Sequence, residues 1–151
     1  MSMAGPEVLL VEDSPDDVEF FLHTFRAARF PVQVQVAQDG AEALDIIFGT
    51  GDHAERGPAG RLKVIVLDLK LPKVDGLEIL RRLKGDLRTR HIPVVVLTSS
   101  LEERDLAESY QLGVNSYVVK PMEFDQYADS VRMLGRYWLE CNATANGQAL
   151  Q

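Results

Sequence analysis

The stretch KVIVLDLKLP, residues 63–72, decides which fold the rest of the chain can adopt. Its apolar run at 64–67 is typical of a strand that is buried on both faces of a sheet. The run ends at Asp68, and a loop with a proline follows. Because ligands of open α/β sheets bind outside the carboxyl ends of the strands, Asp68 is a candidate functional residue.

Four further apolar runs flank this stretch, and each predicts a strand. They are residues 7–11, 32–36, 92–98 and 116–120. The run at 32–36 alternates apolar and polar residues, which predicts a strand at a sheet edge.

Helix start signals separate the strands. Capping residues precede apolar periodic segments, and an acid follows three residues after each cap. These caps are Ser14, Asp39, Asp75 and Ser100. A last helix is expected over residues 123–140, and the segment 49–60, rich in glycine and charge, is expected to be a surface loop. The alternation predicts an α/β fold, a doubly wound five-stranded parallel sheet with five helices.

Composition limits the classes of function. The chain has 151 residues, which is the size of one domain, and a net charge of −7, which disfavours binding to nucleic acid or to an anionic membrane. No stretch approaches the roughly 20 apolar residues of a membrane span. Its one cysteine, Cys141, permits no internal disulfide, so we expect a cytoplasmic protein.

The expected domain covers residues 7–140. Residues 1–6 are expected to be disordered or derived from a cloning tag, because they are short, small and polar. Residues 141–151 are expected to form a frayed C-terminal tail.

Polar residues end several of the predicted strands. Glu12 and Asp13 follow the first strand, and Thr98 and Lys120 end the fourth and fifth. If the strands are parallel, these residues share one rim with Asp68. Clustered carboxylates repel one another, and Mg²⁺ is the cation that oxygen ligands of this kind suit best. With a lysine and a hydroxyl for an anion, the set predicts phosphoryl transfer onto an aspartate.

Four sequence blocks, in order and at these spacings, resemble the receiver domain of two-component response regulators. They are VLLVEDSP at 8–15, LDLKLPKVDG at 67–76, PVVVLTSS at 93–100 and GVNSYVVKP at 113–121. The chain is most similar to the small single-domain regulators associated with phytochrome-type sensor kinases. The resemblance implies a flavodoxin-like strand order of 2-1-3-4-5.

The resemblance also implies roles at the metal end of the site. Asp68 would accept the phosphoryl group from the phosphohistidine of a sensor histidine kinase, so the protein would catalyse its own modification rather than act as an ordinary enzyme. Asp13 would ligate Mg²⁺ directly, and Glu12 would act largely through a bound water. Asp68 itself and the main-chain carbonyl of Lys70 would be further ligands.

Further roles follow at the other end of the site. Thr98 and Lys120 would each bind a phosphoryl oxygen, and Tyr117 would be the switch aromatic that turns inward. Pro121 would follow a cis peptide bond. Lys70 and Ser100 would border the path of the hydrolytic water, which implies a phosphate lifetime distinctive to this protein.

The last helix predicts a partner surface. One apolar stripe, expected to face the sheet, contains Phe124, Ala128, Val131, Leu134 and Trp138. Further apolar and aromatic residues lie largely beyond it, namely Tyr127, Met133, Tyr137 and Leu139. This excess favours a homodimer formed through the last helix, against the alternative of a broad core face with exposed tyrosines. Asp16 and Asp17 are expected to be first-turn acids favoured by the helix dipole.

Three other functions remain open. A degenerate receiver would act only as a protein-binding scaffold. An aspartate-dependent phosphatase would carry a second aspartate where this chain has Lys70. A flavin-binding module of the same fold would need a phosphate-binding loop after the first strand, where Glu12 and Asp13 would repel a phosphate.

Overall fold

The computed structural model describes residues 6–56 and 61–145. The predictions of disorder at the N-terminus and of a frayed C-terminal tail therefore lie outside the described residues for 1–5 and 146–151. Within the described part of the chain, no helix combines the length and the apolar character needed to cross a membrane.

The strands form one parallel sheet of five strands in the order β2-β1-β3-β4-β5, as predicted. They are β1 (Val8–Val11), β2 (Val34–Ala37), β3 (Val64–Leu67), β4 (Val94–Thr98) and β5 (Ser116–Val119). The alternating strand β2 lies at an edge, which confirms that prediction. The strands β1, β3 and β4 in the middle are buried along their whole length.

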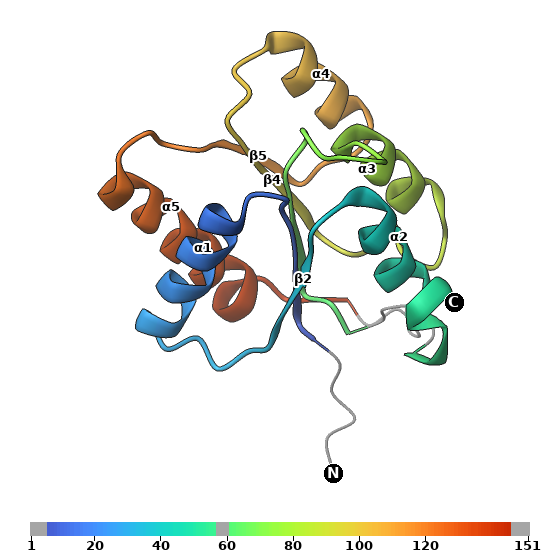
Figure 1. Cartoon of the computed structure of the whole chain (residues 1–151), viewed down its shortest axis with the longest axis horizontal. Coiled ribbons are helices and arrows are strands. Elements are labelled where there is room, and N and C mark those ends of the chain that lie inside the picture. The colour runs from blue at the N-terminus through green and yellow to red at the C-terminus, as the bar shows by residue number, and fades with distance from the viewer. Residues whose placement is uncertain (1–5, 57–60, 146–151) are drawn as a thin grey trace.

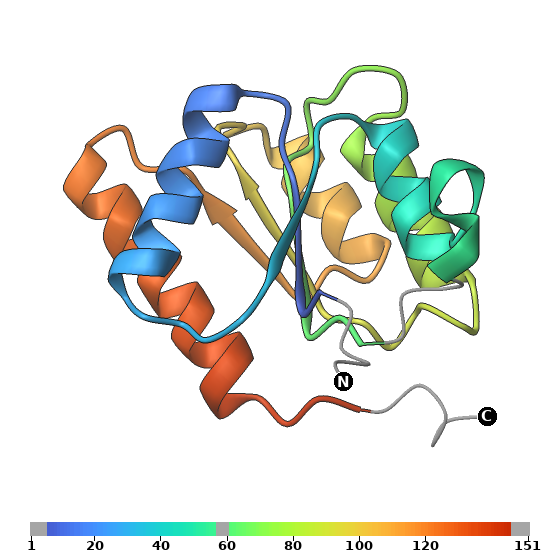
Figure 2. The same ribbon diagram turned by 60° about the horizontal axis from the view of Figure 1, so that its bottom comes forward.

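Helices cover both faces of the sheet, with α1 and α5 on one side and α2, α3 and α4 on the other (Figure 1). The helices are α1 (Pro15–Ala27), α2 (Gly40–Phe48), α3 (Gly76–Gly85), α4 (Glu103–Gln111) and α5 (Phe124–Arg136). A π-helical turn, η2 (Tyr137–Cys141), continues α5. Figure 2 shows the same two helical layers with the strands between them.

Successive residues of the central strands enter opposite cores. In β1, Leu9 and Val11 pack with α2 and α3, whereas Val8 and Leu10 pack with α1 and α5. Because both faces are covered, every position in such a strand must be apolar. This packing explains why the central strands are continuous apolar runs.

Most of the predicted helix caps are confirmed. The side chains of Ser14, Asp39 and Asp75 each accept a hydrogen bond from the backbone N–H three residues later, at 3.4, 2.8 and 3.1 Å. The prediction for Ser100 is wrong, since α4 begins only at Glu103. The Ser100 hydroxyl donates to Asp105 Oδ2 at 2.5 Å instead, which holds Ser100 in the loop before the helix.

The predicted surface loop at 49–60 is partly helical. A 3₁₀ turn, η1 (Gly51–Arg56), occupies its first half. Thr50 stabilises its start, since the Thr50 hydroxyl donates to Asp45 Oδ1 at 2.7 Å. Residues 57–60 lie outside the described part of the chain.

The predicted inward stripe of α5 is partly wrong. Tyr127 is buried with Val131 and Leu134, whereas Phe124 is 73% exposed. Tyr127, Val131 and Leu134 are spaced four and three residues apart and share one helical face. Phe124 is the first residue of α5, and its ring instead lies beside the ring of Phe20 on α1, with centroids 5.3 Å apart and the planes tilted by 34°.

Candidate functional site

Backbone hydrogen bonds at the ends of the strands bring the predicted polar residues to one rim. Asp68 N–H donates to the Val11 carbonyl at 3.1 Å, and Lys120 N–H donates to the Thr98 carbonyl at 2.7 Å. Both bonds extend the parallel ladders by one residue beyond the strands. The residues that follow β1, β3 and β5 therefore meet at the carboxyl edge of the sheet.

Three carboxylates form a compact group at this rim. One oxygen from each of Glu12, Asp13 and Asp68 lies within 4.8 Å of the others. Glu12 and Asp68 are buried, and Asp13 is exposed to solvent. An all-oxygen donor set with one open side fits a hard divalent cation that retains water ligands.

The pKa of Glu12 is raised in this group. Burial and the neighbouring Asp68 charge raise the pKa of Glu12 to about 7, although Lys120 acts in the opposite direction. A raised pKa means that burial disfavours the charged form of this carboxylate, and a nearby cation favours that form. The donor group therefore fits a cation on electrostatic as well as on geometric grounds.

Lys120 inserts its ammonium among these acids. Its Nζ lies 2.7 Å from Glu12 Oε1 and 3.2 Å from Asp68 Oδ2, and its side chain is only 10% exposed. Burial alone would lower the pKa of Lys120, but hydrogen bonds to Glu12 and Asp17 and the Asp68 charge raise it above its ordinary value. Lys120 is therefore charged at neutral pH and is the positive group of the site.

Asp17 joins the site, which sequence reasoning missed. Its Oδ2 lies 2.9 Å from Lys120 Nζ, so Asp17 is not merely a first-turn acid. The signal was its position at the start of α1, directly after the β1 rim. That signal was insufficient because any acid in a first helical turn is favoured by the helix dipole.

Thr98, the last residue of β4, and Tyr117, on β5, both contact the loop between β4 and α4. Thr98 is fully buried, and its Oγ1 accepts a hydrogen bond from Ser100 N–H at 3.3 Å. The Tyr117 hydroxyl donates to the Ser100 carbonyl at 3.2 Å. Both side chains thus hold this loop through Ser100.

The side chain of Lys70 pairs with Asp105 on α4. Its backbone N–H donates to Asp68 Oδ1 at 3.4 Å, whereas its Nζ lies 3.6 Å from Asp105 Oδ2. Asp105 is 6% exposed and was not singled out in the sequence. Together with the Ser100–Asp105 bond, this ion pair links the loop after β3 to α4.

A glycine shapes the loop that carries Asp68. A Cβ at Gly76 would lie 2.4 Å from the Asp68 carbonyl oxygen and 2.6 Å from Leu69 Cα. The Gly76 N–H also donates to the Leu69 carbonyl at 2.9 Å. The loop therefore folds back on itself so closely that only glycine fits at this position.

The expected cis bond before Pro121 is not found. All peptide bonds of the described residues are trans, including the one between Lys120 and Pro121. The trans form is favoured by about 0.5–1 kcal/mol for X–Pro bonds. Lys120 reaches the acids from the trans form, so that geometry needs no cis bond.

Comparison with known proteins gives a consistent result. The sequence pattern described as the response regulator receiver domain matches residues 8–132. The chain is 35% identical over 133 residues to the response regulator Rcp1 of Synechocystis sp.. The aligned region covers 88% of this chain and 88% of Rcp1. A solved structure of Rcp1 in its Mn²⁺-bound form covers 93% of this chain and 99% of that one, with a TM-score of 0.83 and 33% identity.

Two further solved structures are similar over nearly the whole chain. The phosphorylated cyanobacterial phytochrome response regulator RcpA has a TM-score of 0.87 and 34% identity, with coverage of 95% of this chain and 100% of that one. The bacteriophytochrome response regulator AtBRR is 50% identical, with a TM-score of 0.72 and coverage of 93% and 99%.

Proposed function

Since the chain belongs to the response regulator receiver domain family, we propose that it accepts a phosphoryl group on Asp68 from the phosphohistidine of a sensor histidine kinase. One observation carries this proposal: oxygens of three carboxylates lie within 4.8 Å of one another, and Lys120, whose side chain is 10% exposed, contacts Asp68 at 3.2 Å. A nucleophilic carboxylate beside a cation-binding group and an ammonium suits phosphoryl transfer.

Some residues of the rim would bind the cation and others would bind the phosphoryl group. Asp13, Asp68 and the Lys70 carbonyl would hold Mg²⁺, with Glu12 acting largely through a water. The cation would offset the negative charge of the acids and of the incoming phosphoryl oxygens. Lys120 and Thr98 would each bind a phosphoryl oxygen, and Tyr117 would follow Thr98 inward.

The chemical step is a substitution at phosphorus. A carboxylate oxygen of Asp68 attacks, the phosphorus–nitrogen bond to the kinase histidine breaks, and the electron pair of that bond remains on the imidazole. The product is an aspartyl phosphate. Lys120 is already charged and within reach of Asp68, so its positive charge is in place before the phosphoryl group arrives.

We further propose that the kinase is of the phytochrome type. RcpA and AtBRR are both described as phytochrome or bacteriophytochrome response regulators, and this chain covers at least 99% of each. The proposal rests on that similarity.

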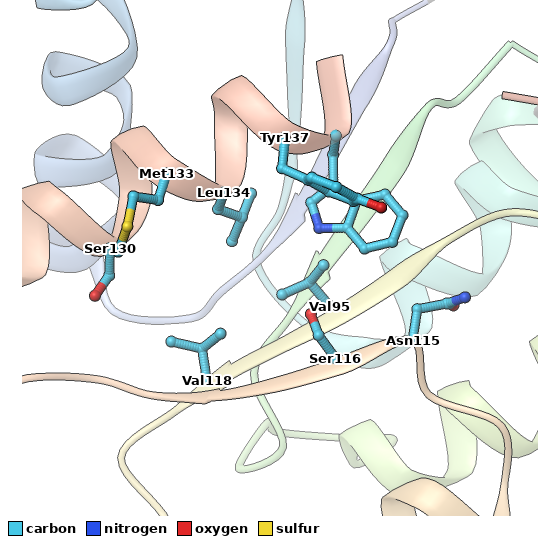
Figure 3. A pocket seen from close by; sticks show the side chains of 9 residues that line it. Val95, Asn115, Ser116, Val118, Ser130, Met133, Leu134 and Tyr137 are labelled. Atoms are coloured by element: carbon cyan, nitrogen blue, oxygen red, sulfur yellow. The ribbon is translucent and has the colours of Figure 1, made fainter. Parts of the chain in front are cut away.

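We also propose that the protein signals as a homodimer through the α5 region. A groove of about 400 Å³ lies between β5 and the end of α5, and Figure 3 shows Met133 and Tyr137 beside it. Its described lining consists of Val95, Asn115, Ser116, Val118, Ser130, Met133, Leu134, Tyr137 and Trp138. None of these residues is charged, and Met133 and Tyr137 are 66% and 51% exposed.

A second copy of the chain is the occupant that this groove suits. A two-fold axis would let Met133 and Tyr137 of each protomer enter the groove of the other, which is the self-complementary arrangement of an isologous interface. If phosphorylation strengthens this dimer, then dimerisation must strengthen phosphate retention by the same factor.

Incubation with acetyl phosphate and Mg²⁺, followed by intact mass spectrometry, tests the main proposal. We expect the wild type to gain the mass of one phosphoryl group and Asp68→Ala to gain none. Asp16→Asn, which alters an exposed acid beside the site, serves as the control and should react like the wild type. A wild type that remains unmodified while a partner still binds would favour the scaffold function.

A further inference from the structure

Lys120 contacts three carboxylates, one of which lies outside the group that would bind a cation. Its ammonium has three protons, and its Nζ lies within hydrogen-bond distance of Glu12 at 2.7 Å, Asp17 at 2.9 Å and Asp68 at 3.2 Å. Two of these acids belong to the compact group that would receive a cation. The third, Asp17, comes from α1 and lies outside that group.

The local structure of α1 leaves the Asp17 carboxylate free for this contact. Asp17 is the third residue after the Ser14 cap, where an acid usually reaches back to the backbone N–H of the cap. Here the Ser14 N–H donates to Glu12 Oε2 at 3.1 Å instead. Because Glu12 performs the capping task, Asp17 can turn toward Lys120.

Asp17 matters because Lys120 and a divalent cation would compete for the carboxylates of Glu12 and Asp68. Glu12 and Asp68 each give one oxygen to Lys120, and a divalent cation that draws on these two carboxylates weakens their bonds to Lys120. The Lys120 side chain is 10% exposed, so an ammonium that lost both partners would be left without compensation in a desolvated place. Asp17 is 34% exposed at the side chain and can keep its bond while the other two are released.

We propose that Asp17 is a positioning residue that holds Lys120 in the site when Glu12 and Asp68 turn to a divalent cation. Asp17 thereby lowers the free energy needed to bind the cation and keeps the ammonium ready for the phosphoryl oxygens. This inference rests on the proposed function, because it assumes that the rim binds such a cation.

Isothermal titration calorimetry with Mg²⁺ alone, on the full chain, tests the inference without any phosphoryl donor. Asp17→Asn should weaken Mg²⁺ binding by about tenfold, the effect of a lost charged hydrogen bond. Asp16→Asn is the matched control, because it removes the same charge from an exposed position in the same helical turn. Solvent and salt should screen its effect to within about twofold.

A double-mutant cycle separates positioning from simple charge. Lys120→Met should bind Mg²⁺ more tightly than the wild type, because the competing ammonium is gone. In that background, Asp17→Asn should change the affinity by less than about threefold, because Asp17 no longer has a lysine to hold. Asp17→Glu should recover most of the affinity, and thermal unfolding should show that each variant is folded.

The outcomes are distinguishable. If the wild type binds no divalent cation, both the proposed function and this inference are wrong. If the wild type binds Mg²⁺ but Asp17→Asn matches Asp16→Asn, only the inference is wrong. The inference also fails if the full tenfold loss persists when Lys120 is Met, because the effect would then come from charge alone.

Discussion

Replacing Gly76 with alanine should damage both stability and phosphorylation, because this glycine lies against the backbone of the loop that carries Asp68. The new Cβ would lie 2.4 Å from the Asp68 carbonyl oxygen and 2.6 Å from Leu69 Cα. Contacts under 3.0 Å are essentially never seen for a Cβ, so the Asp68 carbonyl must retreat by at least about 0.6 Å. Both obstructing atoms are backbone atoms, so no side-chain rotation relieves the clash.

The size of the effect follows from this geometry. Overpacking of this kind costs about 1–3 kcal/mol, which exceeds the gain of about 0.5–1 kcal/mol that alanine brings to a helix. Asp68 is within hydrogen-bond distance of Lys120 at only 3.2 Å, so a shift of its backbone also misplaces the proposed nucleophile. Because misplacements near 1 Å can reduce rates by about 10²-fold, we expect phosphorylation at least about tenfold slower.

Gly85 supplies the matched control at the other end of α3. A Cβ at Gly85 would meet nothing within 4 Å, so Gly85→Ala should be neutral or stabilising. Urea unfolding gives the stabilities, and mass spectrometry after acetyl phosphate treatment gives the rates. If Gly76→Ala is as stable and as reactive as Gly85→Ala, the close approach at Asp68 is not real.

Two further predictions concern other parts of the fold. Lys84→Met should destabilise the protein by about 1 kcal/mol, because the Lys84 ammonium donates to two backbone carbonyls and to Asn115 Oδ1. Burial lowers the pKa of Lys84 to about 8 from 10.5, so above pH 8 the unfolded chain binds more protons and the wild type should gain stability relative to Lys84→Met as pH rises toward 10.5. Chemical unfolding across this pH range would contradict the reasoning if the two proteins kept a constant difference. Tyr137→Glu should abolish dimerisation in light scattering without preventing phosphorylation, whereas Tyr110→Glu, on α4 outside the groove, should leave the dimer intact.

The rim of the sheet was predictable because the parallel direction of the strands follows from the order of elements. Short crossovers between consecutive apolar runs force the strands into one direction. Residues directly after each strand, such as Glu12 and Asp68, must then lie at the same edge. The caps at Asp39 and Asp75 were equally accessible, because capping is decided by residues three apart.

Features decided by competing side-chain hydrogen bonds or by the packing of a helix were not predictable. Ser100 has the sequence of a helix cap, yet its hydroxyl bonds to Asp105, and α4 starts later. Tyr127 rather than Phe124 faces the core, since Phe124 is the first residue of α5 and its ring packs beside Phe20 on α1. Neither choice is encoded in a local pattern.

The sequence by itself determined a parallel sheet covered by helices on both faces and the meeting of Glu12, Asp13 and Asp68, because hydrophobic periodicity and short connections fix the direction of the strands. The strand order was implied by the resemblance to receiver domains. Only the tertiary structure decided that Lys120 has Asp17 as a third partner. That contact joins residues more than one hundred positions apart, at a separation of 2.9 Å. It exists because Glu12 caps α1 in place of Asp17, and such a choice between competing hydrogen bonds depends on side-chain positions in three dimensions.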